Sequence, residues 1–174
     1  MSINQFLSNF KGGAPANRFK VQITWPGAVG SPNVRDEFVV NAAQHPASVL
    51  GQIPVAYQGR QIPIPGDRTF EDWTITVVND KSYSHRSAFE RWSNVINSHE
   101  GNIQGADTLR DMVSTIDVHQ LDRDGSILKT YKLYNAWPNN VSPIELSYDQ
   151  NDVLQTFTVT FAYSHWHSPT SVVN

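Results

Sequence analysis

Apolar and polar residues alternate along several short stretches of the chain, which is the pattern of β-strands that bury one face. In the clearest example, Phe157, Val159 and Phe161 alternate with threonines. The stretch 84–97 instead repeats its apolar residues at three- and four-residue steps, and this spacing predicts an amphipathic helix. The strands predicted by alternation are 19–24, 37–40, 69–78, 113–121, 127–135, 144–148 and 156–163. The pattern therefore predicts a mainly β fold with one α-helix packed on a sheet.

The region 41–68 does not fit this scheme, because it is extended, apolar and rich in proline. Two apolar runs on either side of Gln58-Gly59 predict a hairpin-like arm, and its alternate prolines keep it out of a sheet interior. An apolar segment of this length, if left in water, indicates contact with a partner. The alternative is that the arm folds back over its own core. The candidate contact residues on the arm are Ile53, Val55, Tyr57, Arg60, Ile62 and Ile64.

The composition fits one domain over residues 1–174 and excludes several functional classes. The absence of cysteine excludes disulfides, a thiolate nucleophile and cysteine-ligated metal sites. A formal net charge of -3, without a basic run, argues against a groove that grips nucleic acid. No apolar run approaches the roughly 20 residues of a membrane span, and the first residues do not have the pattern of a signal peptide. We therefore expect no association with a membrane.

Both ends of the chain are expected to be flexible tails. Residues 1–17 carry a small apolar patch between Ile3 and Phe10, followed by a glycine-rich stretch. This segment is either a tether that docks on another surface or a frayed terminus. The second tail begins at Ser164 and contains two histidines.

The sequence contains only weak candidates for catalytic or metal-binding residues. Nucleophile-elbow, Walker and dinucleotide-binding glycine motifs are missing. His165 and His167 would share one face of a strand, but no third ligand lies near them in the sequence. Asp67, Glu71 and Asp72 could serve a carbohydrate-active or carbohydrate-binding β-sandwich, although such a cluster more often forms salt bridges at the start of a strand. We therefore predict no catalytic residue, no metal site and no cofactor.

The last predicted strand has a face of Thr156, Thr158 and Thr160. Threonine is polar and yet strongly β-forming, so this face suits a wall that is in contact with water.

Several short runs, which follow one another in order across most of the chain, resemble the tail tube proteins of contractile-tailed bacteriophages of the T4 type. Each run alone is weakly specific, whereas their order and spacing are more specific. The runs are Asn17-Arg18-Phe19, Gly59-Arg60-Gln61-Ile62, Gly66-Asp67-Arg68-Thr69-Phe70-Glu71-Asp72-Trp73, Val78-Asn79-Asp80, Phe89-Glu90-Arg91-Trp92, Ala136-Trp137-Pro138, Ile144-Glu145-Leu146-Ser147-Tyr148-Asp149 and Phe157-Thr158-Val159-Thr160-Phe161-Ala162-Tyr163.

The resemblance implies two packed antiparallel sheets, as a β-barrel or sandwich, with one flanking helix. It implies a structural subunit, not an enzyme, that forms hexameric rings stacked into a hollow tube within the virion tail, after assembly in the host cytoplasm. The implied partners are copies of the same chain, the sheath protein outside, the baseplate tube-initiator proteins, and the tape-measure protein and DNA in the lumen. In such a tube we expect the arm to make ring-to-ring or subunit contacts, and the threonine face to border the lumen or another wet surface.

Two alternatives stay open. Inner-tube proteins of type VI secretion systems and of contractile bacteriocins have the same fold, and the sequence does not separate them well from phage tubes. The second alternative belongs to a different class, namely the carbohydrate-binding or carbohydrate-active β-sandwich built on the three carboxylates.

Overall fold

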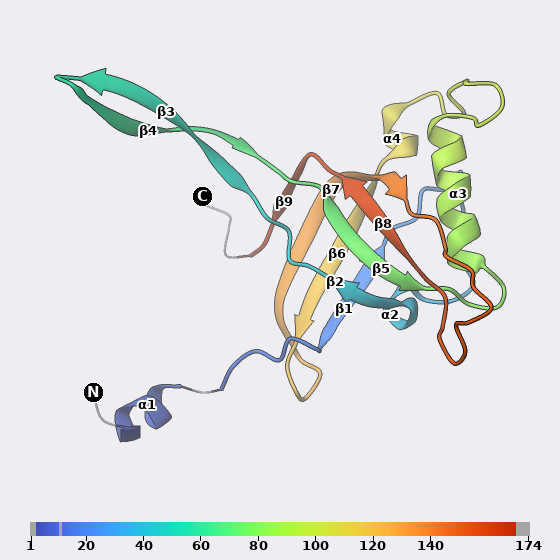
Figure 1. The fold of residues 1–174 in the computed structure, drawn as a ribbon, viewed down its shortest axis with the longest axis horizontal. Helices are drawn as coiled ribbons and strands as arrows, with labels where there is room; N and C mark the ends of the chain where they lie inside the picture. The colour runs from blue at the N-terminus through green and yellow to red at the C-terminus, as the bar shows by residue number, and fades with distance from the viewer. Residues whose placement is uncertain (1–2, 11, 170–174) are drawn as a thin grey trace.

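The computed structural model describes residues 3–10 and 12–169, and most of its regular structure is antiparallel β-sheet (Figure 1). The strands of the main sheet are β1 (Phe19–Ile23), β2 (Val40–Ala43), β5 (Trp73–Val78), β6 (Ser114–Leu121), β7 (Ile127–Val141), β8 (Thr156–Ala162) and β9 (His165–His167). A separate hairpin consists of β3 (Val49–Tyr57) and β4 (Arg60–Thr69). The helices are α1 (Ile3–Asn9), α2 (Asp36–Val39), α3 (Ser84–Ile96) and α4 (Leu109–Met112).

The main sheet folds into two layers because its longest strand takes part in both. The strand order is β1-β6-β7-β8-β5-β2, and β9 pairs with β7. Strand β7 pairs with β6 as far as Ala136 and with β8 from Trp137 onward. Just before this change of partner Asn135 has a φ of 53°, and the register with β6 shifts there, as in a β-bulge that bends a strand. The prediction of a mainly β fold with packed antiparallel sheets is confirmed, but the barrel is not closed, since β1 and β2 end the strand order among the described residues.

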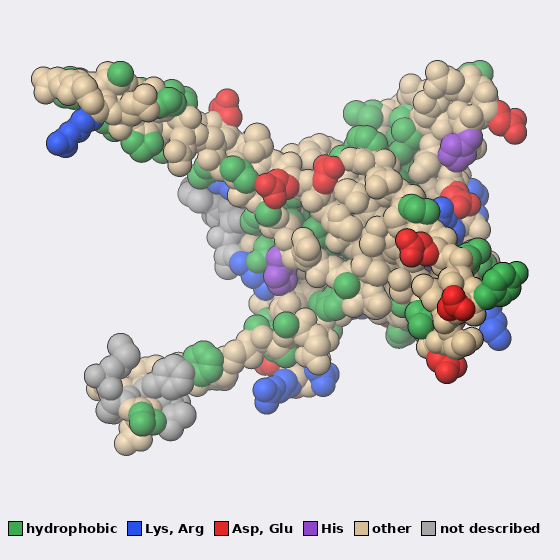
Figure 2. Space-filling model, in the orientation of Figure 1, with side chains coloured by type: hydrophobic (Ala, Val, Ile, Leu, Met, Phe, Trp, Pro, Cys, Tyr) green, Lys and Arg blue, Asp and Glu red, His purple; other side chains and the backbone are tan. Residues whose placement is uncertain are grey.

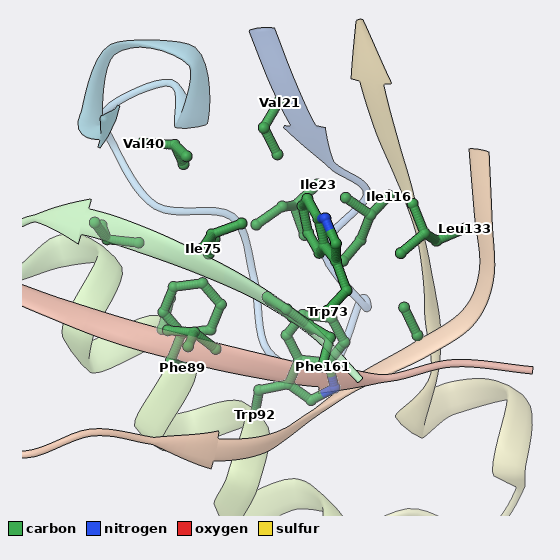
Figure 3. Close-up of a cluster of buried hydrophobic side chains, with 14 of the residues drawn as sticks. Val21, Ile23, Val40, Trp73, Ile75, Phe89, Trp92, Ile116, Leu133 and Phe161 are labelled. Carbon is green, nitrogen blue, oxygen red and sulfur yellow. The ribbon is translucent and has the colours of Figure 1, made fainter. Parts of the chain in front are cut away.

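The core lies between the two layers and α3 (Figure 3). Val21 and Ile116 come from one layer, Ile75 and Phe161 come from the other, and all four are buried. From α3, the fully buried Phe89 lies 4.9 Å from Trp25 and 6.0 Å from Phe161, measured between ring centroids. Each large apolar side chain buried in this way contributes about 1.5–3 kcal/mol. The chain thus has a complete core of its own, without the hairpin.

Helix α3 confirms the amphipathic helix predicted from the sequence, although the shorter helices α1, α2 and α4 show that it is not the single helix expected. Its first turn is held by Asp80, whose carboxylate accepts a hydrogen bond from the Ser84 backbone N–H at 2.9 Å and further bonds from the hydroxyls of Ser82 and Ser84. A carboxylate is favourable at this end of a helix because the helix dipole is positive there. Although burial raises the pKa of the Asp80 carboxyl, the hydrogen bonds from Ser82 and Ser84 outweigh burial and lower that pKa below its usual value.

Several of the predicted strand boundaries are wrong, and the strand expected over 69–78 begins only at Trp73. Residues 37–40 are not a strand, since Asp36–Val39 forms one helical turn and the extended chain begins at Val40. The acidic residues of this turn, Asp36 and Glu37, suit the first turn of a helix. The strand predicted over 127–135 is also longer than expected: β7 continues through Pro138 to Val141, and a bulge before Asn140 accommodates the proline.

Two further expectations differ from the structure. The stretch 144–148 is a loop, because β5 and β7 already occupy both edges of β8 and leave it no neighbouring edge to pair with. From Ser164 a flexible tail was expected, yet His165–His167 pairs with β7, and only 170–174 fall outside the described residues. The N-terminal segment contains the short helix α1, which lies away from the sheets at the end of an extended connection (Figure 1).

Candidate functional site

The β3–β4 hairpin projects from the body of the molecule (Figure 1). Its register places all six predicted contact residues on one face. The antiparallel register opposes Ile53 to Ile64, Val55 to Ile62 and Tyr57 to Arg60. Directly opposed residues lie on the same side of a sheet, so these six side chains form a single stripe, which we call the apolar face. Its five apolar members are between 42% and 60% exposed.

The other side of the hairpin is different in composition. It carries Gln52, Pro54, Ala56, Gln61 and Pro63, which alternate with the residues of the apolar face. From Gln52 to Pro65 the hairpin is thus two-sided, and only one of its sides has large aliphatic and aromatic groups. Because a two-stranded hairpin alone is marginally stable in water, a hairpin with one open apolar side is suited to be covered by a partner.

The base of the hairpin is fixed to the body by hydrogen bonds to the connection between β2 and β3. The indole N–H of Trp73 donates to the Gln44 carbonyl at 2.6 Å, and the indole of Trp166 donates to the Ala47 carbonyl at 3.1 Å. At the same place, the guanidinium of Arg68 donates to the Ser48 hydroxyl at 3.0 Å. These bonds set the direction in which the hairpin leaves the body.

Backbone geometry shapes the hairpin at its tip and near its base. Gln58 and Gly59 have φ angles of 46° and 79°, as the favoured two-residue hairpin turns require. Near the base the register shifts between Leu50 and Gln52, where two glycines face each other. A Cβ atom on Gly66 would lie 3.3 Å from the backbone of Gly51, so the close approach of the strands depends on the missing side chains.

The three threonines predicted to form a wet face lie on the side of β8 that points away from the core. Thr156 is exposed, Thr158 and Thr160 are half-buried, and the residues between them are buried. The hydroxyls of Thr74 and Thr160 lie 3.1 Å apart across the β5–β8 pair. The structure thus places an uncharged hydroxyl surface on this layer, while a border with a lumen stays a prediction.

The carboxylates considered as catalytic candidates lie at the surface of the molecule. Asp67, Glu71 and Asp72 are all exposed, and Asp72 accepts a hydrogen bond from the Asn139 amide at 2.8 Å. Burial raises the pKa of the nearby Tyr163 hydroxyl, and the charges of Asp72 and Glu71 raise it further. Within residues 3–10 and 12–169, no group of three His, Asp or Glu side chains is arranged to hold a metal ion.

A buried polar cluster around Asp36 was not predicted from the sequence. One carboxylate oxygen of Asp36 accepts the backbone N–H of Ile23 at 2.9 Å, and the other lies 3.2 Å from Trp25 Nε1 and 3.1 Å from His85 Nε2. His85 is 1% exposed. The cluster joins β1, α2 and α3. Its partners lie 11 to 49 residues from Asp36 along the chain, so no local sequence motif predicts it.

In the part of the chain that the structure describes, no helix has the length and apolar character needed to cross a membrane. Residues 14–169 match the profile of the family described as phage tail tube protein. The chain is 33% identical to tail tube protein gp19 of Enterobacteria phage T4 over 169 residues, which is 95% of this chain and 99% of that protein. It is 31% identical to the tail tube protein of Serratia phage KSP90, over 93% of this chain and 94% of that protein.

Solved structures agree with this fold. One is a chain from the sheath/tube terminator of an extracellular contractile injection system, with a TM-score of 0.68, 15% identity, and coverage of 91% of this chain and 98% of that chain. Another is a type six secretion system protein, with a TM-score of 0.51, 13% identity, and coverage of 86% and 82%. At these identities the similarity concerns the fold alone. The match of the family profile and the identity to the phage proteins show that the chain belongs to the phage tail tube protein family.

Proposed function

We propose that this chain is the structural subunit of the inner tube of a contractile phage tail, in which hexameric rings stack around a lumen that conducts DNA. The observation that carries the proposal is the exposed hairpin. The core of the body is complete without it, and its apolar face stays half exposed in the single chain. Membership of the tail tube family supports copies of the same chain as the partner that covers this face.

In this proposal the apolar face makes ring-to-ring or subunit contacts. Burying its five apolar side chains removes an exposed patch that a soluble monomer rarely keeps. A closed ring also protects open sheet edges, such as those of β1 and β2, by placing them against a neighbouring subunit. The sheath lies outside the tube, the tape-measure protein and DNA lie inside it, and tube-initiator proteins of the baseplate start its assembly.

The protein works in this proposal by its shape and catalyses no reaction. The threonine face of β8 borders the lumen or another wet surface. Hydroxyl groups carry no charge, so such a wall would let a polyanion slide past without binding it. The formal charge of -3 on the whole chain is consistent with a wall of this kind.

Deletion of 54–63 tests the role of the hairpin. We expect a folded protein that stays as monomers or isolated rings in negative-stain electron microscopy, because the core residues lie outside the deleted segment. Circular dichroism and thermal unfolding check that the body remains folded. Tubes of normal length from the deletion variant would show that the hairpin is not an assembly element.

A secretion or bacteriocin inner tube is the alternative within the same class, and the fold of the extracellular injection system and type six chains supports it. The curated relatives that are more than 30% identical are phage proteins, which favours the phage tail. Neighbouring genes separate the two, since capsid and portal genes accompany a phage tail and a secretion ATPase gene accompanies a type VI system.

A further inference from the structure

The loop 143–155, between β7 and β8, is a second exposed apolar surface at a distance from the hairpin. Its side chains Leu146, Tyr148, Val153 and Leu154 are at least 67% exposed. In Figure 1 the loop lies at the lower right, whereas the hairpin tip lies at the opposite end of the longest axis. A single chain therefore does not bring the two surfaces together.

The loop is firmly held at both of its ends. At the first end the guanidinium of Arg86 donates to the Ser142 carbonyl at 2.6 Å, and the Thr158 backbone N–H donates to the Ser142 hydroxyl at 2.8 Å. At the second end the Asn79 amide and the Tyr83 hydroxyl each reach the Gln155 side-chain oxygen at 3.0 Å. Fixing both ends of the loop reduces the conformational entropy that it loses when it binds, which favours its use as a receptor.

A hollow of about 430 Å³ lies between the loop and its base. Its lining combines the apolar side chains of Val153 and Leu154 with the carboxylate of Glu145 and the amide of Gln150. The loop as a whole carries Glu145, Asp149 and Asp152 and no basic residue. On this side of the molecule, hydrophobic and acidic side chains lie close together, with basic side chains beside them (Figure 2). The hollow therefore fits an occupant that is apolar with a positive charge.

The outer part of the hairpin has this composition. Between 52 and 65 the only charged residue is Arg60, which lies opposite Tyr57 beside the turn. Tyrosine and arginine are the residue types that most often anchor an interface when they enter a pocket. Tyr57 is 60% exposed in the single chain and so is free to enter one.

We propose that the hairpin tip of one copy docks in the hollow beneath the 143–155 loop of a second copy, where Arg60 pairs with Glu145 and Tyr57 packs against Val153 and Leu154. The proposal rests on the proposed function, because it names the surface of the neighbouring subunit that receives the hairpin. The two docking surfaces are different and lie at opposite ends of the molecule. Such a head-to-tail contact does not close in a dimer but repeats into a ring or a helical stack.

The absence of natural cysteines allows a direct test of this contact by cross-linking. The paired variant carries Gln58→Cys at the hairpin tip and Gln150→Cys at the hollow. A short bismaleimide should link assembled subunits of this variant into dimers and higher ladders on a denaturing gel. The matched control replaces Gln150→Cys by Arg123→Cys in the exposed β6–β7 turn, and it should stay largely unlinked.

Charge exchange tests the ion pair by itself. Arg60→Glu should raise the protein concentration needed for assembly by about tenfold, as expected for a desolvated pair at an interface. Adding Glu145→Arg should restore most of the loss, whereas adding Asp111→Arg, a carboxylate outside the loop, should not. All these side chains are exposed, so the folded monomer should keep its circular dichroism spectrum.

The outcomes separate the two proposals. Cross-links in the paired variant together with rescue by Glu145→Arg support the docking contact. If the unsubstituted protein forms tubes but neither cross-linking nor rescue occurs, the docking contact is overturned and the proposed function stands. If the unsubstituted protein forms neither rings nor tubes, both proposals fail.

Discussion

Truncating the central isoleucine pair of the hairpin should weaken assembly without unfolding the subunit. Ile53 and Ile64 lie opposite each other on the apolar face, and they are 54% and 46% exposed. Full burial of an isoleucine is worth about 1.5–3 kcal/mol, so covering the half that is still exposed is worth about 1 kcal/mol for each residue. The double variant Ile53→Ala/Ile64→Ala should therefore lose about 2 kcal/mol of association free energy per hairpin, which raises the concentration needed for assembly by about 30-fold.

Sedimentation velocity over a concentration series, with electron microscopy of each sample, measures this shift. The control Gln52→Ala/Gln61→Ala changes the other side of the same hairpin and should assemble at the concentration of the unsubstituted protein. The thermal midpoint of the monomer should change little in both variants, because a cross-strand pair contributes only about 0.2–1 kcal/mol to the free energy of unfolding. Equal assembly of the two double variants would refute the assignment of the contact to the apolar face.

Two predictions concern the stability of the body. Asp36→Ala leaves the Ile23 N–H, Trp25 Nε1 and His85 Nε2 without their shared acceptor. It should therefore lower the free energy of unfolding, measured in urea, by about 2–4 kcal/mol. A loss below about 1 kcal/mol would show that water replaces the carboxylate. Because the pKa of Asp80 is lowered in the folded protein, its carboxylate stabilises the fold at pH values above the unfolded-state pKa of about 3.9. This contribution is lost as the pH falls through the folded-state pKa. In urea titrations from pH 7 to pH 3 the Asp80→Asn variant should lose less stability than the unsubstituted protein, and parallel losses would contradict this role.

The spacing of apolar residues was sufficient to predict the central strands, where it alternates, and α3, where it follows three- and four-residue steps, because packing on one face requires these periods. In β5, Trp73, Ile75 and Val77 are buried while the residues between them are not, as the sequence predicted. The same rule failed at 144–148, where alternation is real but only Ile144 packs against the core, while Leu146 and Tyr148 are exposed. Alternation indicates a segment with one apolar and one polar side. It does not indicate whether a strand with a free edge lies beside that segment.

The position of the hairpin could also be predicted, since proline, glycine and isoleucine follow one another in a short run. The six candidate residues share one face because the two strands pair in register across the Gln58-Gly59 turn. The Asp36 cluster and the anchored 143–155 loop could not be predicted, because their partners are distant in sequence and meet only in the folded chain. A lone Asp, His or Trp gives no local sequence signal that it will contact residues distant in the sequence.

Electron microscopy of the purified full-length protein over a rising concentration series tests most directly whether copies of the chain complete one another's apolar surfaces. We predict hollow rings that stack into tubes, with the hairpin protected from protease and from hydrogen exchange once they form. A protein that remains a single species of monomer at every concentration, with its hairpin equally exposed throughout, would contradict the assignment of this chain as a self-assembling tube subunit.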